Sequence, residues 1–558
     1  MFKELGVPNG TYMSIKNILW VPALLGISLG IARAEVQTLD VELRLLTQDA
    51  LEVSYTLPPS CASLPFLMHG RDGKVVRQNW QSRDGCGTAS ADQLARTGQA
   101  CPVLRFEVPA STVRAGYPSA FPMGQGMYVH LSNYAVGDAC GKVNYRLAAP
   151  WVAAEGRSRQ DGMRLTDGGD ASALLLTVPP TVRIAGTPAY FDPRLAPAVA
   201  DRIRKVADGT TGYLRRALPH ARFTAPIVAA ARVPDRGGPH FEGDAHDVLR
   251  LALYNWPDKP SPDDQAALTR FVAHEFSHRF QLRDAVDVYP DARLIHEGGA
   301  EFLRWLTSVQ KGWMTPREAA ADLDQALATC VLGADGQRWR ALPPRTIGVN
   351  RLEYTCGLPV YVYALAARQR PGSALARIDA FYEAIRQGAQ PDFARALGCG
   401  AAAATCMSPW TARLLDGAAP MEQEWDNMLR ATGLAHPEPP TQALRDTMVE
   451  HALVKLMRDD CGGRVDSMQQ SDGLLLGGMK ACKTFTKDAY VTAVEGLPVR
   501  GNANTGAAMA AACTAHGKLV LGLKDGATLD MPCTESYRMR SSFYQVDIDS
   551  VLQALMRN

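Results

Sequence analysis

Residues 264–305 read DQAALTRFVAHEFSHRFQLRDAVDVYPDARLIHEGGAEFLRW, and this stretch decides how the rest of the chain is interpreted. It contains the pattern His274-Glu275-x-x-His278, and Glu297 follows after eighteen further residues. An α-helix turns once in about 3.6 residues, so His274 and His278 share a face and can point two imidazoles at one ion. Glu275 lies about 100° round the same helix, where a general base for a metal-bound water is needed.

The sequence before the pattern predicts the start of a helix. Ser261 is a suitable N-cap, Pro262 suits the first helical position, and two aspartates fall in the first turn. Apolar residues then recur at every fourth position and form a stripe for burial. These residues are Leu268, Val272, Phe276 and Phe280.

Two imidazoles, one carboxylate and an open fourth position form a set that catalytic zinc sites use. We therefore expect His274, His278 and Glu297 to hold one Zn²⁺ ion, with Glu275 as the base. The alternative is two helix histidines that pack or cap without a metal. Glu301, four residues after Glu297, would share its helical face and could orient a ligand histidine; the alternative is a solvated helix acid.

The spacing resembles the gluzincin pattern of aminopeptidase-N-like zinc metallopeptidases, and more loosely that of glycyl-aminopeptidase-like enzymes. The resemblance covers residues 185–435. It implies that His274, His278 and Glu297 bind zinc and that Glu275 activates water. It also implies that the tyrosine of a Tyr-x-x-Gly segment stabilises the oxyanion, and here that residue is Tyr354. The alternative for Tyr354 is a packed tyrosine.

The chain departs from this family at two places. The aminopeptidases carry a Gly-x-Met-Glu-Asn strand motif whose Glu holds the free amino group of the substrate, and no such motif is present here. Glu242 or Asp247 could substitute, and the sequence does not choose between them. The family residue before the Glu ligand is usually Asn, whereas this chain has His296.

Composition places the chain among ordinary globular proteins. It has 558 residues, enough for two to four domains, with 46% hydrophobic and 21% charged residues. The net charge is +2, and no concentrated basic segment favours a nucleic-acid partner.

The N-terminus has the pattern of an export signal. A short basic region after Met13 precedes the apolar run 18–32, and Ala32-Arg33-Ala34 is a suitable cleavage site. We predict a signal peptide at 1–34, with Met13 as the true start, and a periplasmic or secreted protein that keeps no stable membrane anchor. The alternative is an uncleaved anchor.

Twelve cysteines follow the cleavage site, and an even number beyond an export signal favours disulfides. Pairing neighbours in order keeps each bridge within one predicted domain. The resulting hypothesis is 61–86, 101–140, 330–356, 399–406, 461–482 and 513–533.

The order of patterns predicts a multidomain α+β protein. Residues 35–183 alternate apolar and polar positions and predict an N-terminal β-sandwich. Residues 184–436 predict a thermolysin-like, mainly helical catalytic domain. Pro437-Glu438-Pro439-Pro440 is typical of a stiff linker. Residues 441–558 predict a small β-rich domain that looks PDZ-like and could bind an extended chain; the alternative is a disulfide-stabilised domain of no stated role.

Together these features predict an exported zinc metallopeptidase that hydrolyses peptides or proteins through a water activated by Glu275. The alternatives are a non-catalytic, zinc-containing peptide-binding protein and a zinc hydrolase of other substrates. Three arginines flank the site in sequence, and an exposed, solvated side chain is the simplest expectation for each. They are Arg293, Arg304 and Arg345.

Overall fold

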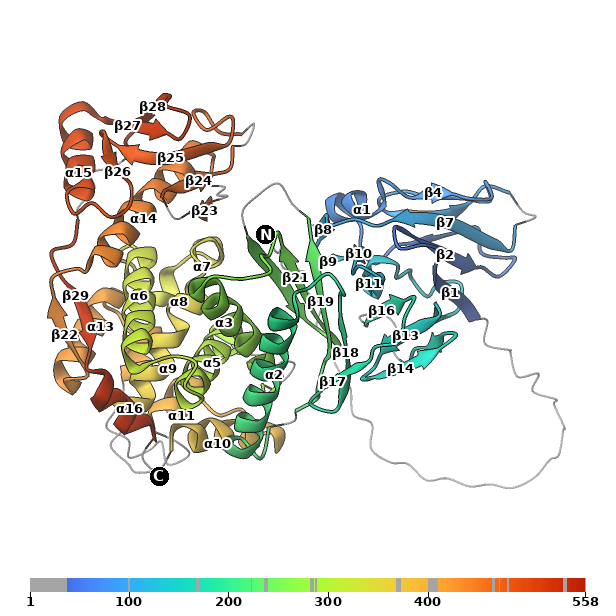
Figure 1. Cartoon of the computed structure of the whole chain (residues 1–558), viewed down its shortest axis with the longest axis horizontal. Helices are drawn as coiled ribbons and strands as arrows, with labels where there is room; N and C mark the ends of the chain where they lie inside the picture. The colour runs from blue at the N-terminus through green and yellow to red at the C-terminus, as the bar shows by residue number, and fades with distance from the viewer. Residues whose placement is uncertain are drawn as a thin grey trace, which may run out of the picture. The chain divides into compact units, whose positions relative to one another are not determined.

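The structure is a computed structural model, and it divides into two compact units (Figure 1). The first unit reaches Val152 and includes Arg159–Pro179; the second comprises Ala153–Ser158 and the chain from Pro180 onward. The predicted signal peptide, its start at Met13 and its cleavage site lie outside the described residues. The described residues are 38–98, 101–166, 171–221, 223–234, 239–281, 286, 289–367, 373–399, 410–463, 467–470, 472–478, 481–534 and 539–556.

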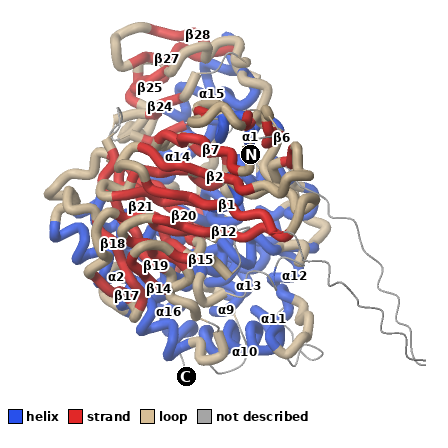
Figure 2. Tube along the Cα trace, turned by 90° about the vertical axis from the view of Figure 1, so that its right-hand side faces the viewer, coloured by secondary structure: helices blue, strands red, loops and turns tan. Residues whose placement is uncertain are grey.

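The first unit is built mainly from two sheets, of which the end of β13 and the start of β14, within Ala153–Ser158, are assigned to the second unit. One has the order β15-β12-β1-β2-β7-β4 and the other β10-β11-β16-β13-β14. Figure 2 shows β7, β2, β1 and β12 side by side. Alternate residues of β1 are buried, as a strand with one face on a core requires, and β1 contacts β16 of the other sheet. The strands are β1 (Thr38–Leu45), β2 (Ala50–Thr56), β4 (Gln81–Ser82), β7 (Val103–Pro109), β10 (Ala120–Pro122), β11 (Gly126–His130), β12 (Lys142–Ala148), β13 (Trp151–Ala154), β14 (Arg157–Gln160), β15 (Met163–Arg164) and β16 (Ser172–Leu176).

The second unit begins with a five-stranded sheet of order β17-β18-β19-β21-β20. The three inner strands are parallel and the two outer strands are antiparallel to their neighbours. Every residue of β21 is buried, and its alternate residues Leu249, Leu251 and Leu253 share a core with helices α2 (Pro197–Ala217) and α3 (Pro262–His278). The strands are β17 (Val182–Ile184), β18 (Thr187–Phe191), β19 (Ile227–Val233), β20 (His240–Ala245) and β21 (Val248–Tyr254).

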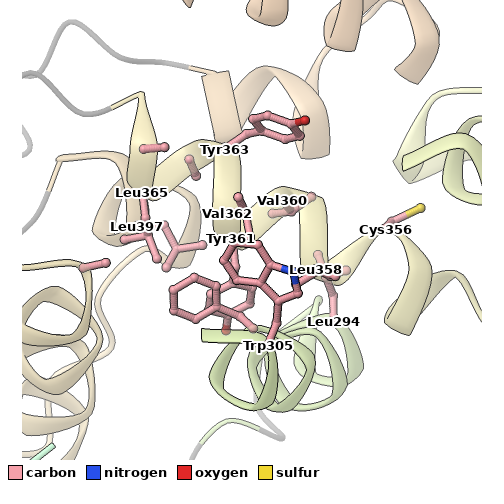
Figure 3. Close-up of a cluster of buried hydrophobic side chains, with 14 of the residues drawn as sticks. Leu294, Trp305, Cys356, Leu358, Val360, Tyr361, Val362, Tyr363, Leu365 and Leu397 are labelled. Atoms are coloured by element: carbon pink, nitrogen blue, oxygen red, sulfur yellow. The ribbon is translucent and has the colours of Figure 1, made fainter. Parts of the chain in front are cut away.

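Helices follow the sheet and enclose the largest core of the chain. All ten residues of α9 are buried, so this apolar helix runs through the middle of the core. Figure 3 shows Trp305 of α5 among the side chains of α9. The helices are α5 (Gly299–Gln310), α6 (Pro316–Ala334), α7 (Pro344–Val349), α8 (Leu352–Thr355), α9 (Gly357–Ala366), α10 (Ala374–Arg386), α11 (Phe393–Cys399), α12 (Trp410–Asp416) and α13 (Met421–Thr432).

The first two residues of the segment expected to be a linker, Pro437 and Glu438, belong to a strand. β22 (Ala435–Glu438) pairs antiparallel with β29 (Phe543–Val546), and α16 (Ile548–Met556) contributes to the same core as α9. Pro437 is tolerated in this strand because the strand pairs on one side only. Only a distant partner segment could reveal this pairing. The second unit is not divided further at residues 436 or 441, so the domain boundaries predicted there remain predictions.

Between β22 and β29 lies a smaller module with its own core. Its sheet has the order β23-β24-β25-β27-β28, with β26 beside β25. Helices α14 and α15 supply buried residues to this core. The elements are α14 (Gln442–Asp460), β23 (Ser467–Gln469), β24 (Leu474–Leu476), β25 (Ala489–Val494), β26 (Leu497–Pro498), α15 (Thr505–His516), β27 (Lys518–Leu523) and β28 (Thr528–Pro532).

The described residues contain five disulfides. The predicted bridges 330–356, 461–482 and 513–533 are confirmed. The predicted bridges 61–86 and 101–140 are wrong, because Cys61 pairs with Cys140 and Cys86 with Cys101. Strand pairing brings cysteines 79 residues apart to within bonding distance there, which proximity in sequence cannot indicate. The predicted bridge 399–406 lies outside the described residues.

None of the helices in the described part of the chain combines the length and apolar character that a membrane span requires.

Candidate active site

The two histidines lie in the last turn of α3, and the start of this helix is well defined. The Ser261 side chain accepts a hydrogen bond from the Asp264 backbone N–H at 3.1 Å, and the Asp264 carboxylate accepts one from the Ser261 N–H at 3.1 Å. This reciprocal cap fixes the first turn. The predicted stripe from Leu268 to Phe280 is fully buried. The cap and the stripe together set the rotation of α3, and therefore the direction in which His274 and His278 point.

Glu297 lies in a π-helical turn, η2 (Leu294–Gly298), immediately before α5. Such a turn disturbs the regular hydrogen-bond ladder, and π-turns are frequent at functional sites. Two side chains bind the carbonyls of this turn. Gln281 Nε2 donates to the His296 carbonyl at 2.8 Å, and the Tyr361 hydroxyl donates to the Ile295 carbonyl at 2.9 Å. The turn that carries Glu297 is therefore anchored to α9 and to the segment directly after α3.

Three potential ligand atoms converge at this point. The Nε2 atoms of His274 and His278 are 3.0 Å apart, and Glu297 Oε2 lies 3.5 and 3.2 Å from them. Zinc bonds of about 2.0–2.1 Å in a tetrahedron place neighbouring ligand atoms about 3.3 Å apart. The observed spacing therefore fits one zinc ion with a fourth position open.

The other nitrogen of each imidazole faces an oxygen acceptor. His274 Nδ1 lies 2.7 Å from Glu301 Oε1, and His278 Nδ1 lies 3.0 Å from Gln281 Oε1. A neutral imidazole with its proton on Nδ1 presents the Nε2 lone pair, as a metal ligand must. Glu301 thus lies where the sequence suggested. Gln281 was not identified from the sequence, because its role depends on the distant η2 turn.

The carboxylates of Glu297 and Glu301 favour a positive charge at this site. Burial lowers the pKa of His274, but hydrogen bonds to Glu297 and Glu301 raise it to about 10 overall. Burial would raise the pKa of Glu297, yet hydrogen bonds from the two histidines hold it far below its usual range. Protons or a metal cation can supply this charge, and a bound metal would displace protons from the imidazoles.

A buried ionic chain continues from Glu301. Arg304 Nε donates to Glu301 Oε2 at 3.0 Å, and Arg304 Nη1 lies 2.5 Å from Asp322 Oδ2. Arg270, one turn before His274 on α3, lies 3.2 Å from the other oxygen of Asp322. The expectation of an exposed Arg304 is wrong, since only 5% of this residue is exposed. Two carboxylates, Glu301 on the same helix and Asp322 on the next one, compensate the charge of the buried Arg304.

The two other arginines have different outcomes. Arg293 is exposed as expected, but it also forms an ion pair with the buried Glu353 at 2.7 Å. The side chain of Arg345 lies outside the described residues.

Glu275 is half-buried on α3 beside the two imidazoles. Burial raises its pKa above the ordinary value, and the positive charge of His274 and His278 partly opposes that shift. A carboxylate with a raised pKa can take up a proton more readily near neutral pH, as a general base must.

Tyr354 lies against the ligand set from α8. Its ring stacks on His274 with centroids 5.7 Å apart. Burial raises the pKa of its hydroxyl far above neutrality, and the Glu297 charge raises it further. The phenol therefore keeps its proton and can donate a hydrogen bond.

Two glycines allow Tyr354 to come this close. A Cβ at Gly298 would lie 2.6 Å from the Cα of Gly357, so the backbones of η2 and α9 touch. Gly298 follows Glu297 directly, and Gly357 is the glycine of the Tyr-x-x-Gly segment. The Cys330–Cys356 disulfide ties the same point to α6. The glycines in both motifs therefore have a packing role.

The two acids considered for substrate binding lie at the edge of the sheet. Glu242 is on β20, with Oε2 3.5 Å from the Tyr254 hydroxyl, and Asp247 follows that strand, 3.6 Å from His246 Nδ1. Their proposed role therefore stays open. His296, which replaces the usual Asn, stacks on His278 with centroids 4.2 Å apart.

No protein-family model matches this sequence, and no curated protein resembles it significantly. Among solved structures, the chain is similar to an aminopeptidase N family protein from Idiomarina loihiensis. That match has 12% identity and a TM-score of 0.56, and it covers 93% of this chain and 100% of that one.

Two weaker similarities involve an M1 zinc metallopeptidase from Deinococcus radiodurans and the native leukotriene A4 hydrolase from Saccharomyces cerevisiae. The first has 14% identity, a TM-score of 0.37 and coverage of 68% and 92%; the second has 12%, 0.35, and 75% and 72%. These two scores are too low to support an argument. The first similarity shows the fold: this is a multidomain α+β chain with the fold of an aminopeptidase N family protein.

Proposed function

We propose that this chain, which has the aminopeptidase-N-like gluzincin fold, is an exported zinc-dependent metallopeptidase. The observation that carries the proposal is the convergence of His274 Nε2, His278 Nε2 and Glu297 Oε2 within 3.5 Å of one another. Glu275 beside this set supplies the base that a purely structural zinc site does not need.

When bound, zinc supplies Lewis acidity and lowers the pKa of water, which makes hydrolysis possible at neutral pH. Glu275 takes the proton of the attacking water and passes it to the leaving amine. Tyr354 donates its phenolic proton in a hydrogen bond to the developing oxyanion. Glu301 and Gln281 hold the two imidazoles in the orientation that binds the metal.

Strand β20 supports a peptide as the substrate. It is an outer strand of its sheet and contacts α3, so it lies next to the helix that carries Glu275. An extended peptide can add to an outer strand through backbone hydrogen bonds. The proposed substrate is therefore a peptide or an extended segment of a protein.

The disulfides support the proposed export, because such bonds persist in oxidising compartments. Within the module between β22 and β29, the order β25, turn, β26, α15, β27 supports the PDZ-like interpretation. We propose that its sheet edge binds an extended peptide. Peptides titrated against the full chain should perturb backbone amide resonances of β23 or β28; perturbations confined to the catalytic region would exclude this role.

The test of the main proposal combines metal analysis with peptide cleavage. The purified chain should contain about one zinc per molecule, cleave a mixed pool of quenched peptides, and lose this activity with a chelator. Glu275→Gln should retain the metal and lose about 10²–10⁴-fold in kcat. Zinc without cleavage of any peptide would favour the non-catalytic binding protein. Cleavage of small-molecule esters or epoxides alone would favour a hydrolase of other substrates.

A further inference from the structure

Two exposed arginines lie near the Tyr354 segment: Arg351 contacts the Tyr354 ring, and Arg293 pairs with the preceding residue, Glu353. The Arg351 guanidinium carbon lies 4.4 Å from the centroid of the Tyr354 ring, in a cation–π contact. The same ring stacks on His274. The charge of Arg351 is therefore separated from a candidate metal ligand by a single aromatic side chain.

Arg293 lies directly before η2, the turn that carries Glu297. Its Nη2 and Nε lie 2.7 and 3.2 Å from Glu353 Oε1, and both contact this one oxygen. Glu353 is buried, with 3% of its side chain exposed, whereas 62% of the Arg293 side chain is exposed. A buried acid thus holds an arginine whose Nη1 makes no hydrogen bond to any described residue. Arg293 also interacts electrostatically with Glu297 and Tyr354, although its main partner is Glu353.

The backbone at Arg351 indicates a functional reason for its side chain. This residue has φ 49° and ψ 41°, the left-handed conformation that glycine adopts without strain. Its carbonyl accepts hydrogen bonds from the N–H groups of Tyr354 and Thr355. A strained residue with a large charged side chain, at a position suited to glycine, is often found in functional sites.

The charges of Arg293, Arg351 and Glu353 do not cancel. Arg293 and Arg351 contribute two positive charges and Glu353 one negative charge. Glu297 is already engaged by the two imidazoles. A guanidinium presents a planar fork of N–H donors that matches a carboxylate, and partial desolvation strengthens such a bond.

We propose that Arg293 and Arg351 bind a carboxylate of the substrate close to the scissile bond, which makes this enzyme selective for acidic peptides. The inference rests on the proposed peptidase function and specifies its substrate class. The carboxylate belongs either to an acidic side chain or to the C-terminus of a short peptide, and these two sources share the same chemistry.

The experiment compares four matched quenched peptides with the zinc-loaded full chain. They carry Glu or Gln beside the cleaved bond, each with a free or an amidated C-terminus. We expect kcat/KM to be at least tenfold higher with a carboxylate than with its amide counterpart, mainly through KM. A difference between the Glu and Gln peptides identifies an acidic side chain as the source of the carboxylate. A difference between the free and the amidated peptides identifies the C-terminus.

Arg351→Gly is the most informative variant, because glycine accepts the left-handed backbone and only the side chain is lost. The acidic-to-neutral ratio should fall about tenfold in this variant. Arg293→Gln alone would leave Glu353 buried without its partner, so the double variant Arg293→Gln/Glu353→Gln tests that side chain without an unpaired charge. Arg430→Gln is the matched control, since Arg430 also has 62% side-chain exposure and an ion-paired acid.

A binding measurement separates recognition from turnover. In the Glu275→Gln background, calorimetry should show tighter binding of the Glu peptide than of the Gln peptide, and Arg351→Gly should abolish that difference. An unchanged acidic-to-neutral ratio in both arginine variants would overturn the inference. An equal loss of kcat for all four peptides would also overturn it, because the arginines would then act through Tyr354. Cleavage of none of the peptides by the unmodified, zinc-loaded chain would instead refute the peptidase proposal.

Discussion

The site has two sides that are built differently. The metal side, on α3, η2 and α5, places His274, His278, Glu297 and Glu301 in a half-buried to buried network in which each charge faces a partner. The tyrosine side, on α8 and the start of α9, places Tyr354 next to an exposed arginine in a left-handed turn, and a disulfide and a glycine contact hold it. The first side can fix an ion rigidly, and the second stays open enough to meet a substrate.

The largest expected effect is a loss of zinc affinity, and it should occur on the metal side only. Glu297→Gln removes the only anionic ligand of the set, so zinc affinity should fall by more than about 100-fold, since even an outer-shell partner is worth about 10–100-fold. Competition with a chromogenic chelator measures this affinity. Phe in place of Tyr354 serves as the comparison, and zinc affinity within about threefold of the unmodified chain is expected there. Equal losses in both variants would mean that the two sides do not function separately.

The next effect concerns the tyrosine side alone. Tyr354→Phe removes one oxyanion donor, and kcat should fall about 10²–10³-fold with a smaller change in KM. Steady-state kinetics with a good peptide substrate measure both constants. Tyr289→Phe is a control for the loss of a phenol, because Tyr289 lies against Phe381 in the helical core. A rise in KM with kcat unchanged would assign Tyr354 to ground-state binding instead.

A smaller effect is expected from the orienting network of the metal side. Glu301→Gln keeps the size of the side chain but loses the charge that faces His274 Nδ1 and Arg304. Zinc affinity should fall about 10–100-fold. Asp322→Asn, one step further along the chain, should have a weaker effect of the same sign. A stronger effect at Asp322 than at Glu301 would show that the network acts through the fold rather than through the imidazole.

The smallest expected effect is a change in stability with pH, and it arises on α6. This helix contributes Asp322 to the metal side and Cys330 to the tyrosine side. Burial raises the pKa of Asp324 to about 7, although its hydrogen bond from the Val546 N–H at 2.9 Å opposes the shift. The folded chain therefore holds an extra proton between about pH 4 and 7, and stability should fall as the pH rises through this window.

Asp324→Asn can still accept the Val546 hydrogen bond and has no charge to bury. At pH 8 it should be more stable than the unmodified chain by about 1–2 kcal/mol, allowing for solvent screening at a half-buried position. At pH 4 the gain should disappear. Thermal unfolding at both pH values tests this expectation, with Asp201→Asn on the exposed face of α2 as a control. A gain of equal size at both pH values would contradict the assigned cause.

Local patterns predicted several elements well. Helix α3 begins at Pro262 after its Ser261 cap, as the sequence predicts, and the predicted apolar stripe of this helix is buried. These features depend on hydrogen bonds and apolar contacts within one or two turns, so neighbouring residues suffice to specify them. Patterns did not reveal β20, whose residues His240–Ala245 lack a regular apolar alternation. This strand is defined by its pairing with β21.

The sequence by itself determined the chemistry available to this protein: two imidazoles one turn apart, an adjacent carboxylate, a second carboxylate eighteen residues on, and a tyrosine followed by a glycine. Helical periodicity alone places the first three together. Tertiary structure decided which groups surround them. It buried Arg304 between Glu301 and Asp322, set Gln281 on the η2 carbonyls, paired Arg293 with Glu353, and joined Cys61 to Cys140 and Cys86 to Cys101. Most of these contacts join residues from different elements, and their energies depend on burial and charge compensation that exist only after the chain has folded.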